Sequence, residues 1–373
     1  MVAYAVGLVA RARGIGKNRV VLYWRIALMP RIFVGMSGGV DSSVAASLLV
    51  EQGHEVVGIY MKNGSEDLPG MQCPWAEDVA DAKRVAVSLG IDFRIFDFQK
   101  EYKQRVVDEM VAEYKRGRTP NPDIMCNQEV KFKLFWEAAR EQGAEMIATG
   151  HYAQTSGGKL LRAVDESKDQ TYFLYRVSSE ALEKTIFPLG AYTKPHVREM
   201  ARERGLWTAE KKESMGICFV GQVGIREFLS EYVETAPGDI IDISSHDVVG
   251  RHDGTIFYTL GQRHGLNIGG GLPYYVVGKN MDKNEVYVST RLHADELWHK
   301  EITLGDIHWI AGEPREGMYH VRVRHQAPLV KAHLNGATLQ LEEPQRAVSP
   351  GQSVVIYDGQ VCLGGGIVQT DLT

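Results

Sequence analysis

The residues most able to do chemistry form the hexapeptide Ser37-Gly38-Gly39-Val40-Asp41-Ser42, called the phosphate loop below. It follows an apolar run, residues 32–34, that predicts a strand, and it opens a segment with helical spacing. Adjacent glycines let backbone N–H groups approach phosphate closely, and a helix N-terminus adds unpaired donors and positive dipole potential. The hexapeptide lacks the gap and the lysine of a Walker loop. It therefore predicts a pyrophosphate-binding turn of another kind.

Two of the four cysteines lie in segments that could give them a chemical role. Cys126 follows Thr119-Pro120-Asn121-Pro122-Asp123, which is so rich in proline and asparagine that it predicts a loop. Cys218 follows Lys211-Lys212, which would lower the pKa of its thiol if they folded close to it. Neither belongs to a C-x-x-C zinc pair, so each is either a reactive thiol or a small buried residue. Cys362 lies in an apolar strand and is expected to be buried.

From Arg31 to about Gly150, apolar runs of strand length alternate with segments of helical periodicity. The predicted strands are residues 32–34, 56–61, 93–98 and 146–149. Repeated βα units predict a mostly parallel sheet with helices on both faces. Ligands of such sheets bind beyond the carboxyl ends of the strands, where the phosphate loop, Met61 and Gly150-His151 all lie. The pattern predicts a nucleotide pocket at this edge.

Beyond about Gly205 the sequence becomes polar and glycine-rich, and from about Met281 it indicates short strands separated by turns. These strands predict a small C-terminal β-barrel and are residues 285–289, 319–324, 338–341, 353–357 and 361–363. In residues 319–324, alternation predicts one packed face and one basic face carrying His320, Arg322 and Arg324. That basic face is either solvated or in contact with RNA.

The composition is that of a globular protein with more than one domain. Of 373 residues, 44% are hydrophobic and 24% charged, and the chain exceeds the usual size of a single core. The sequence has no apolar run long enough to cross a bilayer, and four cysteines do not make a dense disulfide framework. We therefore expect a cytoplasmic protein without a membrane partner. The formal net charge of −5 argues against indiscriminate nucleic-acid binding.

Residues 1–30 carry basic side chains and no acidic residue. Three interpretations are open: a targeting segment, a basic RNA-contacting arm, or upstream sequence translated from a wrongly chosen start. The last is favoured, because the segment has no serine or threonine and no convincing small-residue cleavage site. The fold proper is expected to begin at Arg31.

Several short motifs occur together and in a specific order. They are Gly35-Met36 with the phosphate loop, Asn121-Pro122-Asp123 with Cys126-Asn127, Ala148-Thr149-Gly150-His151-Tyr152, Lys168-Asp169-Gln170, Gly216-Ile217-Cys218-Phe219, Gly261-Gln262-Arg263 and Pro350-Gly351-Gln352-Ser353. In this order they resemble the bacterial tRNA-specific 2-thiouridylases of the PP-loop ATP pyrophosphatase superfamily. The resemblance spans almost everything from Arg31 onward. The departures are the basic extension and Met215, where a hydroxyl residue is expected.

The resemblance implies an α/β fold with three parts. A parallel-sheet PP-loop domain of the adenine nucleotide alpha hydrolase-like type would be followed by a small central domain and a C-terminal β-barrel. The expected boundaries are residues 1–30 for the extension, 31–205 for the ATP-binding catalytic domain, 206–280 for the central tRNA-binding domain and 281–373 for the barrel. The protein is expected to be a monomer.

The implied activity is that of an ATP-dependent tRNA-uridine 2-sulfurtransferase. The C2 oxygen of the wobble uridine would attack the α-phosphate of ATP, and sulfur would then replace the adenylated oxygen. Cys218 would receive a persulfide from a sulfur-donor relay protein or a cysteine desulfurase. Cys126 would complete the transfer, either through released hydrosulfide or by attack on the persulfide, which leaves a Cys126–Cys218 disulfide. Asp123 would exchange a proton with the base, form an Asx turn after Pro122, or do both.

The resemblance also implies binding positions. The nucleotide contacts are Gly35, Met36, Ser37, Gly38, Gly39, Val40, Asp41, Ser42, Met61 and Gly150. The tRNA contacts are Asn121, Pro122, Asp123, His151, Lys168, Asp169, Gln170, Arg324, His325 and Gln352. Mg²⁺ would accompany ATP, with Asp41 as a direct or water-mediated anchor. A less favoured alternative is an iron–sulfur cluster held by Asp123, Cys126 and Cys218.

Two other functions fit parts of the sequence. An amide-forming PP-loop synthetase that uses ammonia would need the phosphate loop but not the cysteine pair. A noncatalytic tRNA-binding or sulfur-carrier protein would need neither an intact Asp41 nor Asp123. The thiouridylase is favoured because all of these residues are present together.

Overall fold

The computed structural model describes residues 29–64, 75–212, 224–269, 271, 273–291 and 297–369. The basic extension through residue 28 lies outside this part of the chain. Cys218 and the motif around it also lie outside it, within residues 213–223. The predictions for these segments stay predictions.

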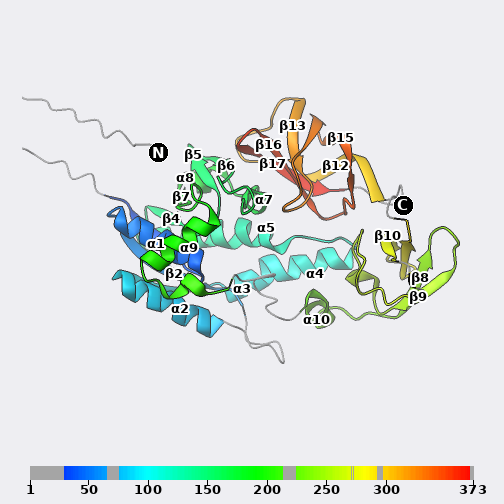
Figure 1. Cartoon of the computed structure of the whole chain (residues 1–373), viewed down its shortest axis with the longest axis horizontal. Coiled ribbons are helices and arrows are strands. Elements are labelled where there is room, and N and C mark those ends of the chain that lie inside the picture. The colour runs from blue at the N-terminus through cyan, green and yellow to red at the C-terminus, as the bar shows by residue number, and fades with distance from the viewer. Residues whose placement is uncertain are drawn as a thin grey trace, which may run out of the picture.

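Five short strands form a parallel sheet in the order β3-β2-β1-β4-β7. Their bounds are Arg31–Gly35 for β1, Glu55–Lys62 for β2, Asp92–Asp97 for β3, Met146–Ala148 for β4 and Thr185–Ile186 for β7. The side chains of β1 alternate between two cores, because Ile32 and Val34 join one buried cluster and Phe33 joins the other. The predicted sheet with two covered faces is therefore confirmed (Figure 1).

Helices of two groups cover the two faces of this sheet. One group is α1 (Val40–Glu51), α2 (Trp75–Leu89) and α9 (Lys194–Glu203). The other consists of two continuous helical runs: α3 (Gln99–Tyr102), η1 (Lys103–Val107) and α4 (Asp108–Lys115), then α5 (Pro122–Cys126), η2 (Asn127–Leu134) and α6 (Phe135–Glu141). The segments η1 and η2 are π-helical. In the described part of the chain, every helix is too short or too polar to span a membrane.

The segment around Cys126 is helical, so the prediction of a loop is wrong. Asn121 is the N-cap of α5, and its side-chain oxygen accepts hydrogen bonds from the N–H groups of Asp123 and Ile124 at 3.1 and 3.4 Å. Pro122 follows the cap at the start of the helix, where an N–H group has no helical partner to lose. The proline and asparagine are thus helix-start signals, and the capping side chain belongs to Asn121 rather than to Asp123.

Shorter elements complete the first domain. They are the hairpin β5 (Gln154–Ser156) and β6 (Lys159–Leu161), the helices α7 (Thr171–Leu174) and α8 (Ser179–Glu183), and the 3₁₀ turn η3 (Trp207–Glu210). Strand β6 pairs with the last strand of the barrel, so this hairpin extends the barrel sheet. This hairpin was not predicted from the sequence.

The central domain holds a four-stranded sheet in the order β10-β11-β8-β9. Its elements are α10 (Ile225–Ser230), β8 (Gly238–Asp242), β9 (Val248–His252), η4 (Thr255–Phe257), β10 (Tyr275–Asn280) and β11 (Glu285–Ser289). Strand β11 pairs with β8 and β10. The grouping of residues 285–289 with the barrel strands is therefore wrong, because their register partners lie in the central sheet.

The C-terminal segment forms the predicted barrel. Its strands are β12 (Trp298–Trp309), β13 (Gly317–Arg322), β14 (Val330–Asn335), β15 (Thr338–Arg346), β16 (Ser353–Asp358) and β17 (Val361–Val368). Six strands follow the order β12-β15-β14-β13-β16-β17, and pairing of β12 with β17 closes the ring. Figure 1 shows the barrel above the helical runs of α4 and α5, between the first domain and the central sheet.

A buried ion pair joins the barrel to the first domain. Nη1 of Arg322 donates to Oδ2 of Asp169 at 3.2 Å, and the two residues are only 6% and 1% exposed. The hydroxyl of Thr171 also donates to Asp169, at 2.8 Å. The prediction that Val321 and Val323 face a packed side is confirmed, but Arg322 does not contribute to an exposed basic face. Its charge is compensated inside the protein.

We expect Arg322→Met to lower the free energy of unfolding by about 1–3 kcal/mol, because the substitution removes a buried charged hydrogen bond to Asp169 and leaves Arg162, 4.0 Å away, as its charge partner. Urea denaturation followed by circular dichroism measures this change. Arg202→Met is the control, since Arg202 pairs with Glu210 at 2.7 Å on the exposed surface, where an ion pair contributes about 0–1 kcal/mol. Equal losses for both variants would contradict the interpretation.

Candidate active site

The phosphate loop lies at the carboxyl end of β1 and leads into α1. Gly38 has a φ of +75°, and a Cβ atom there would lie 2.4 Å from the carbonyl oxygen of Asp78. Only glycine fits this position. Gly39 is the N-cap of α1 and supplies no capping side chain. The first turn of α1 therefore keeps backbone N–H groups that can donate hydrogen bonds to a phosphate.

Three predicted nucleotide-binding segments meet at this edge of the sheet. A Cβ atom on Gly35 would lie 3.0 Å from Cε of Met61. A Cβ atom on Gly150 would lie 2.7 Å from the backbone nitrogen of Ser42 and 2.9 Å from the carbonyl carbon of Asp41. The structure thus brings together the ends of β1, β2 and β4, as expected for a parallel sheet. Their individual contacts with adenosine stay predictions.

Asp41 is held by Lys194 and Tyr152, neither of which was predicted to contact it. Nζ of Lys194 donates to both carboxylate oxygens at 2.8 and 2.7 Å, and the hydroxyl of Tyr152 donates to Oδ1 at 2.8 Å. Lys194 begins α9 and is 7% exposed. It lies 153 residues from Asp41 along the chain, so no local sequence pattern connects the two.

This arrangement does not fit Asp41 as a direct ligand of Mg²⁺. Both oxygens already accept from the Lys194 ammonium, and a second cation at the same oxygens would be repelled by it. Mg²⁺ also demands near-octahedral oxygen ligands. In the structure, the negative charge of Asp41 is instead compensated by the Lys194 ammonium.

Cys126 and Asp123 lie on α5, on the opposite face of the sheet from α1. Cys126 is 2% exposed. Burial raises the pKa of the Asp123 carboxyl, and the Lys131 ammonium opposes this rise. A carboxyl with a raised pKa exchanges protons closer to neutral pH, which suits a general acid or base.

His151 is an uncharged residue in this site. Its ring lies 5.6 Å from that of Phe132 and 6.2 Å from that of Phe187, and its Nδ1 is hydrogen-bonded to the hydroxyl of Thr149 at 2.8 Å. Burial lowers the pKa of His151 well below its usual value, and the Lys131 ammonium lowers it further. A tRNA contact by His151 would therefore be made by a neutral ring.

Phe173 links the helix of Cys126 to the barrel. Nδ2 of Asn127 donates to the Phe173 carbonyl at 3.0 Å, and the Phe173 ring lies 4.3 Å from that of His325. Arg324 is exposed beside His325. The structure thus brings these two predicted tRNA contacts of the barrel toward Cys126.

The other predicted tRNA positions differ in accessibility. Asp169 is buried by Arg322, so its contact with tRNA would require the ion pair to open. Oε1 of Gln170 accepts from the backbone N–H of Tyr152 at 2.9 Å. Lys168 is half-buried. Nε2 of Gln352 donates to the carbonyl of Thr119 at 3.1 Å, which places it beside the segment that leads into α5.

Lys211, one of the two lysines near Cys218 in the sequence, pairs with carboxylates of α2. Its ammonium donates to Asp78 and Asp81 of α2 at 2.8 and 2.6 Å. Its charge is therefore compensated by these two carboxylates, and the predicted effect of Lys211 and Lys212 on the Cys218 thiol stays a prediction. Cys218 itself lies outside the described residues.

Comparison with known proteins decides the family. Three family models match in order: the tRNA methyl transferase HUP domain at residues 30–222, the tRNA methyl transferase PRC-barrel domain at 226–290 and the aminomethyltransferase beta-barrel domain at 299–368. The tRNA-specific 2-thiouridylase MnmA of Bacillus subtilis (strain 168) is 46% identical over 351 residues, 91% of this chain and 94% of that protein. The MnmA of Levilactobacillus brevis is 45% identical over 356 residues, 91% and 95% of the two chains. The chain belongs to the tRNA-specific 2-thiouridylase family.

Membership of the 2-thiouridylase family confirms the predicted resemblance and, with the observed sheet and barrel, the predicted fold class. Among solved structures, a 4-thiouridine synthetase–RNA complex with bound ATP has 20% identity and a TM-score of 0.36, covering 55% of this chain and 50% of that one. The NMN synthetase from Francisella tularensis has 18% identity and a TM-score of 0.33, covering 54% and 72%. These TM-scores are too low to support an argument. The exact domain boundaries stay a prediction.

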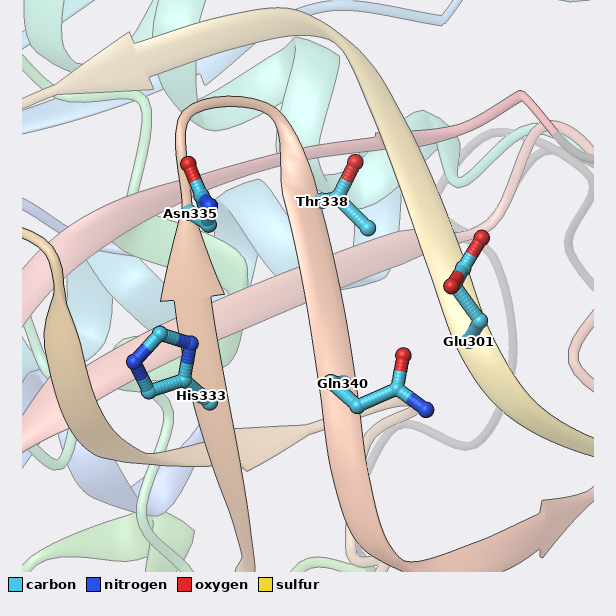
Figure 2. A pocket seen from close by; sticks show the side chains of 5 residues that line it. All are labelled: Glu301, His333, Asn335, Thr338 and Gln340. Carbon is cyan, nitrogen blue, oxygen red and sulfur yellow. The ribbon is translucent and has the colours of Figure 1, made fainter.

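Two surface hollows of this 2-thiouridylase family member lie away from the phosphate loop. One, of about 480 Å³, is on the outer wall of the barrel. Figure 2 shows its lining, which projects from three neighbouring strands and consists of Glu301, His333, Asn335, Thr338 and Gln340. The other, of about 390 Å³, lies between the first domain and the barrel and includes Asn121 and Arg176. Within the described ranges, no three His, Cys, Asp or Glu side chains gather to hold a metal ion. The cluster alternative involves Cys218 and stays open.

Buried and half-buried histidines of this 2-thiouridylase family member make its stability depend on pH. Burial lowers the pKa of His151, His252, His299, His308 and His325. Below about pH 6.5 the unfolded chain binds protons that these folded residues do not bind, so the free energy of unfolding decreases. Each histidine contributes at most about 1.4 kcal/mol per pH unit.

We therefore expect the free energy of unfolding to decrease as the pH falls from about 7 to 5, and to decrease less steeply in His151→Asn. Urea titrations at several pH values measure the slope. An identical slope in the variant and the unsubstituted protein would contradict a lowered pKa of His151.

Proposed function

We propose that this chain is a tRNA-uridine 2-sulfurtransferase that activates the C2 oxygen of the wobble uridine with ATP and replaces it with sulfur. The observation that supports this most is a chain of contacts across the site. Gly150 packs against the backbone of Ser42 in the phosphate loop. The next residue, His151, packs against Phe132, which lies on the helical run that carries Cys126. These contacts support an activating site beside a sulfur-transfer site.

The first step in this proposal is adenylation. The uridine oxygen attacks the α-phosphorus of ATP, the bond from that phosphorus to the bridging oxygen breaks, and pyrophosphate leaves with its electrons. Backbone N–H groups of the phosphate loop and the Lys194 ammonium stabilise the charge on pyrophosphate. Asp41 positions Lys194 at the loop through the two hydrogen bonds of 2.7 and 2.8 Å.

The second step is sulfur transfer. The terminal sulfur of a persulfide on Cys218 adds to C2 of the adenylated base, and AMP leaves with the former uridine oxygen. The Cys126 thiolate then attacks the Cys218 sulfur, which releases 2-thiouridine and leaves a Cys126–Cys218 disulfide. A thiol reductant returns both cysteines to the reduced state with two electrons. Asp123 exchanges the proton of the base during addition and elimination, assisted by its raised pKa.

Substrate binding in this proposal uses the surfaces nearest Cys126. The wobble base must leave its stack in the anticodon loop to reach a thiol that is 2% exposed, which costs a few kcal/mol. Arg324, His325 and Gln352 would compensate by contacting the loop. A relay protein or a cysteine desulfurase would supply sulfur to Cys218, and the protein would act as a cytoplasmic monomer.

In vitro thiolation tests the proposal. Unmodified tRNA is incubated with the protein, ATP, Mg²⁺, a cysteine desulfurase with cysteine, and a thiol reductant, and nucleosides are then analysed by mass spectrometry. We expect 2-thiouridine only when ATP is present, with one pyrophosphate released for each product formed. Absence of 2-thiouridine would refute the proposal. Pyrophosphate release that requires ammonia instead of sulfur would favour the amide synthetase.

Iron analysis distinguishes the persulfide route from the cluster alternative. The protein is purified without oxygen and assayed for iron and sulfide together with thiolation activity. We expect full thiolation in iron-free protein. Thiolation that requires bound iron would overturn the persulfide route.

A further inference from the structure

Lys131 lies on the same helical face as two residues of the proposed site. The helix α5 continues directly into η2, because the backbone N–H of Asn127 donates to the carbonyl of Asp123. Asp123, Asn127 and Lys131 are spaced four residues apart, which places them on one side of the helical run in successive turns. Side chains on a helix lean toward its N-terminus, so the long Lys131 side chain leans toward Asp123 and Cys126.

The charge of Lys131 reaches two elements of the site. It lowers the pKa of Asp123 on its own helix and the pKa of His151 on the segment after β4. The neighbouring Phe132 ring, 5.6 Å from the His151 ring, shows independently that η2 packs against this segment. Lys131 therefore lies where η2 meets residues 149–151.

That position lies between the two halves of the proposed reaction. On one side, Gly150 approaches the backbone nitrogen of Ser42 so closely that a Cβ atom would lie 2.7 Å from it. On the other side lies α5 with Cys126. In the proposed chemistry, the α-phosphorus is bonded first to pyrophosphate at the phosphate loop and then to the uridine oxygen near Cys126. The α-phosphate must lie between these two groups.

Three other lysines near the site pair with carboxylates. Lys194 is bound to Asp41 at 2.7 Å, and Lys211 to Asp81 at 2.6 Å. Lys133 is only two residues from Lys131 but points to the other side of η2, where it pairs with Glu129 at 3.1 Å on the exposed surface. Lys133 therefore provides a matched control for the charge of Lys131.

We propose that Lys131 is a further catalytic residue whose ammonium binds the α-phosphate of ATP and of the adenylated uridine. This inference rests on the proposed function and adds a residue to it. The ammonium neutralises the charge that builds on the α-phosphoryl group as the uridine oxygen attacks, and it stabilises AMP as the leaving group in the sulfur step. Loss of one such preorganised group typically slows a reaction by about 10²–10³-fold.

The proposal predicts a selective change in ligand binding. We expect Lys131→Met to weaken the binding of AMP by about tenfold or more, the usual effect of losing one charge-assisted hydrogen bond. Pyrophosphate should bind as it does to the unsubstituted protein, because its site is the phosphate loop with Lys194. Isothermal titration calorimetry with AMP and with pyrophosphate measures both affinities without any reaction.

Kinetics give a second measurement. We expect tRNA-dependent pyrophosphate release to be about 10²–10³-fold slower in Lys131→Met, partly retained in Lys131→Arg, and unchanged in Lys133→Met. Unchanged AMP binding in Lys131→Met, an equal loss of pyrophosphate binding, or an equal loss in Lys133→Met would each overturn the proposal. If Lys131→Met does not fold, Lys131→Gln and Lys131→Arg replace it. The proposal is then supported if Lys131→Arg binds AMP and Lys131→Gln does not. Equal AMP affinities of these two variants overturn it.

The unsubstituted protein separates this inference from the proposed function. If the unsubstituted protein thiolates tRNA and Lys131→Met has normal AMP binding and kinetics, the role of Lys131 is refuted and the proposed function is not. Absence of thiolation by the unsubstituted protein would refute the proposed function, whatever the AMP affinities are.

Discussion

Cys126→Ser is expected to make no 2-thiouridine while it still releases pyrophosphate from ATP in the presence of tRNA. The substitution exchanges one atom in a side chain that is 2% exposed, so α5 and its Asn121 cap should form as before. A serine hydroxyl is not ionised at neutral pH and cannot form a disulfide with Cys218. The reaction should therefore stop after AMP has left, at the adduct in which the base is joined to Cys218 through the transferred sulfur. Nucleoside mass spectrometry and a pyrophosphate assay on the same samples measure the two steps separately.

Cys362→Ala is the matched control for the loss of a buried cysteine. Cys362 lies in β17, is 1% exposed, and has a thiol whose pKa is raised by burial, so it should be chemically inert. We expect this variant to thiolate tRNA normally. Product formation by Cys126→Ser would rule out Cys126 as the transfer thiol, whereas loss of pyrophosphate release would show that Cys126 acts earlier than proposed.

Lys194→Met is expected to slow pyrophosphate release by about 10²–10³-fold and to weaken the binding of pyrophosphate. The ammonium is the group that Asp41 holds beside the phosphate loop, at 2.7 and 2.8 Å from its oxygens. Its removal takes away a positive charge and leaves a carboxylate that repels phosphate. Stopped-flow pyrophosphate detection and calorimetry measure the two effects. The double variant Asp41→Asn/Lys194→Met, which removes the unpaired charge, should fold normally and stay inactive.

Arg204→Met tests whether Lys194 matters only because it ties α1 to α9. Arg204 follows α9 and makes two hydrogen bonds of 2.6 and 2.8 Å to Glu51, the last residue of α1, far along the same pair of helices from Asp41. We expect Arg204→Met to release pyrophosphate at the rate of the unsubstituted protein. A similar loss in both variants would mean that Lys194 acts through helix packing and not through its charge.

What could be predicted from the sequence was mostly local along the chain. The phosphate loop was identified because its strand, its glycines and its helix follow one another within residues 32–42. The barrel strands were found from alternation and turns. The same local reasoning failed at Asn121 and Pro122, because these residue types occur both in loops and at helix starts, and only the hydrogen bonds of the cap distinguish the two.

What could not be predicted depends on pairs of residues that are distant along the chain. Asp41 and Lys194, like Asp169 and Arg322, are 153 residues apart, and no periodicity connects either pair. Strand β11 was assigned to the barrel because its sequence suits any sheet, and its partner β8 decides where it belongs. These charge pairs could therefore be identified only from the three-dimensional structure.

The pairing of β6 with β17 has a consequence for how this protein can be divided. A fragment that ends after the first domain would leave β6 without its partner strand and Asp169 without Arg322. Two tyrosine hydroxyls, of Tyr172 and Tyr175, would also lose their hydrogen bonds to Ser353. An open strand edge and uncompensated polar groups favour aggregation over folding. Because the barrel strands come last in the chain, we expect the first domain to complete its folding only after the ribosome has released these strands.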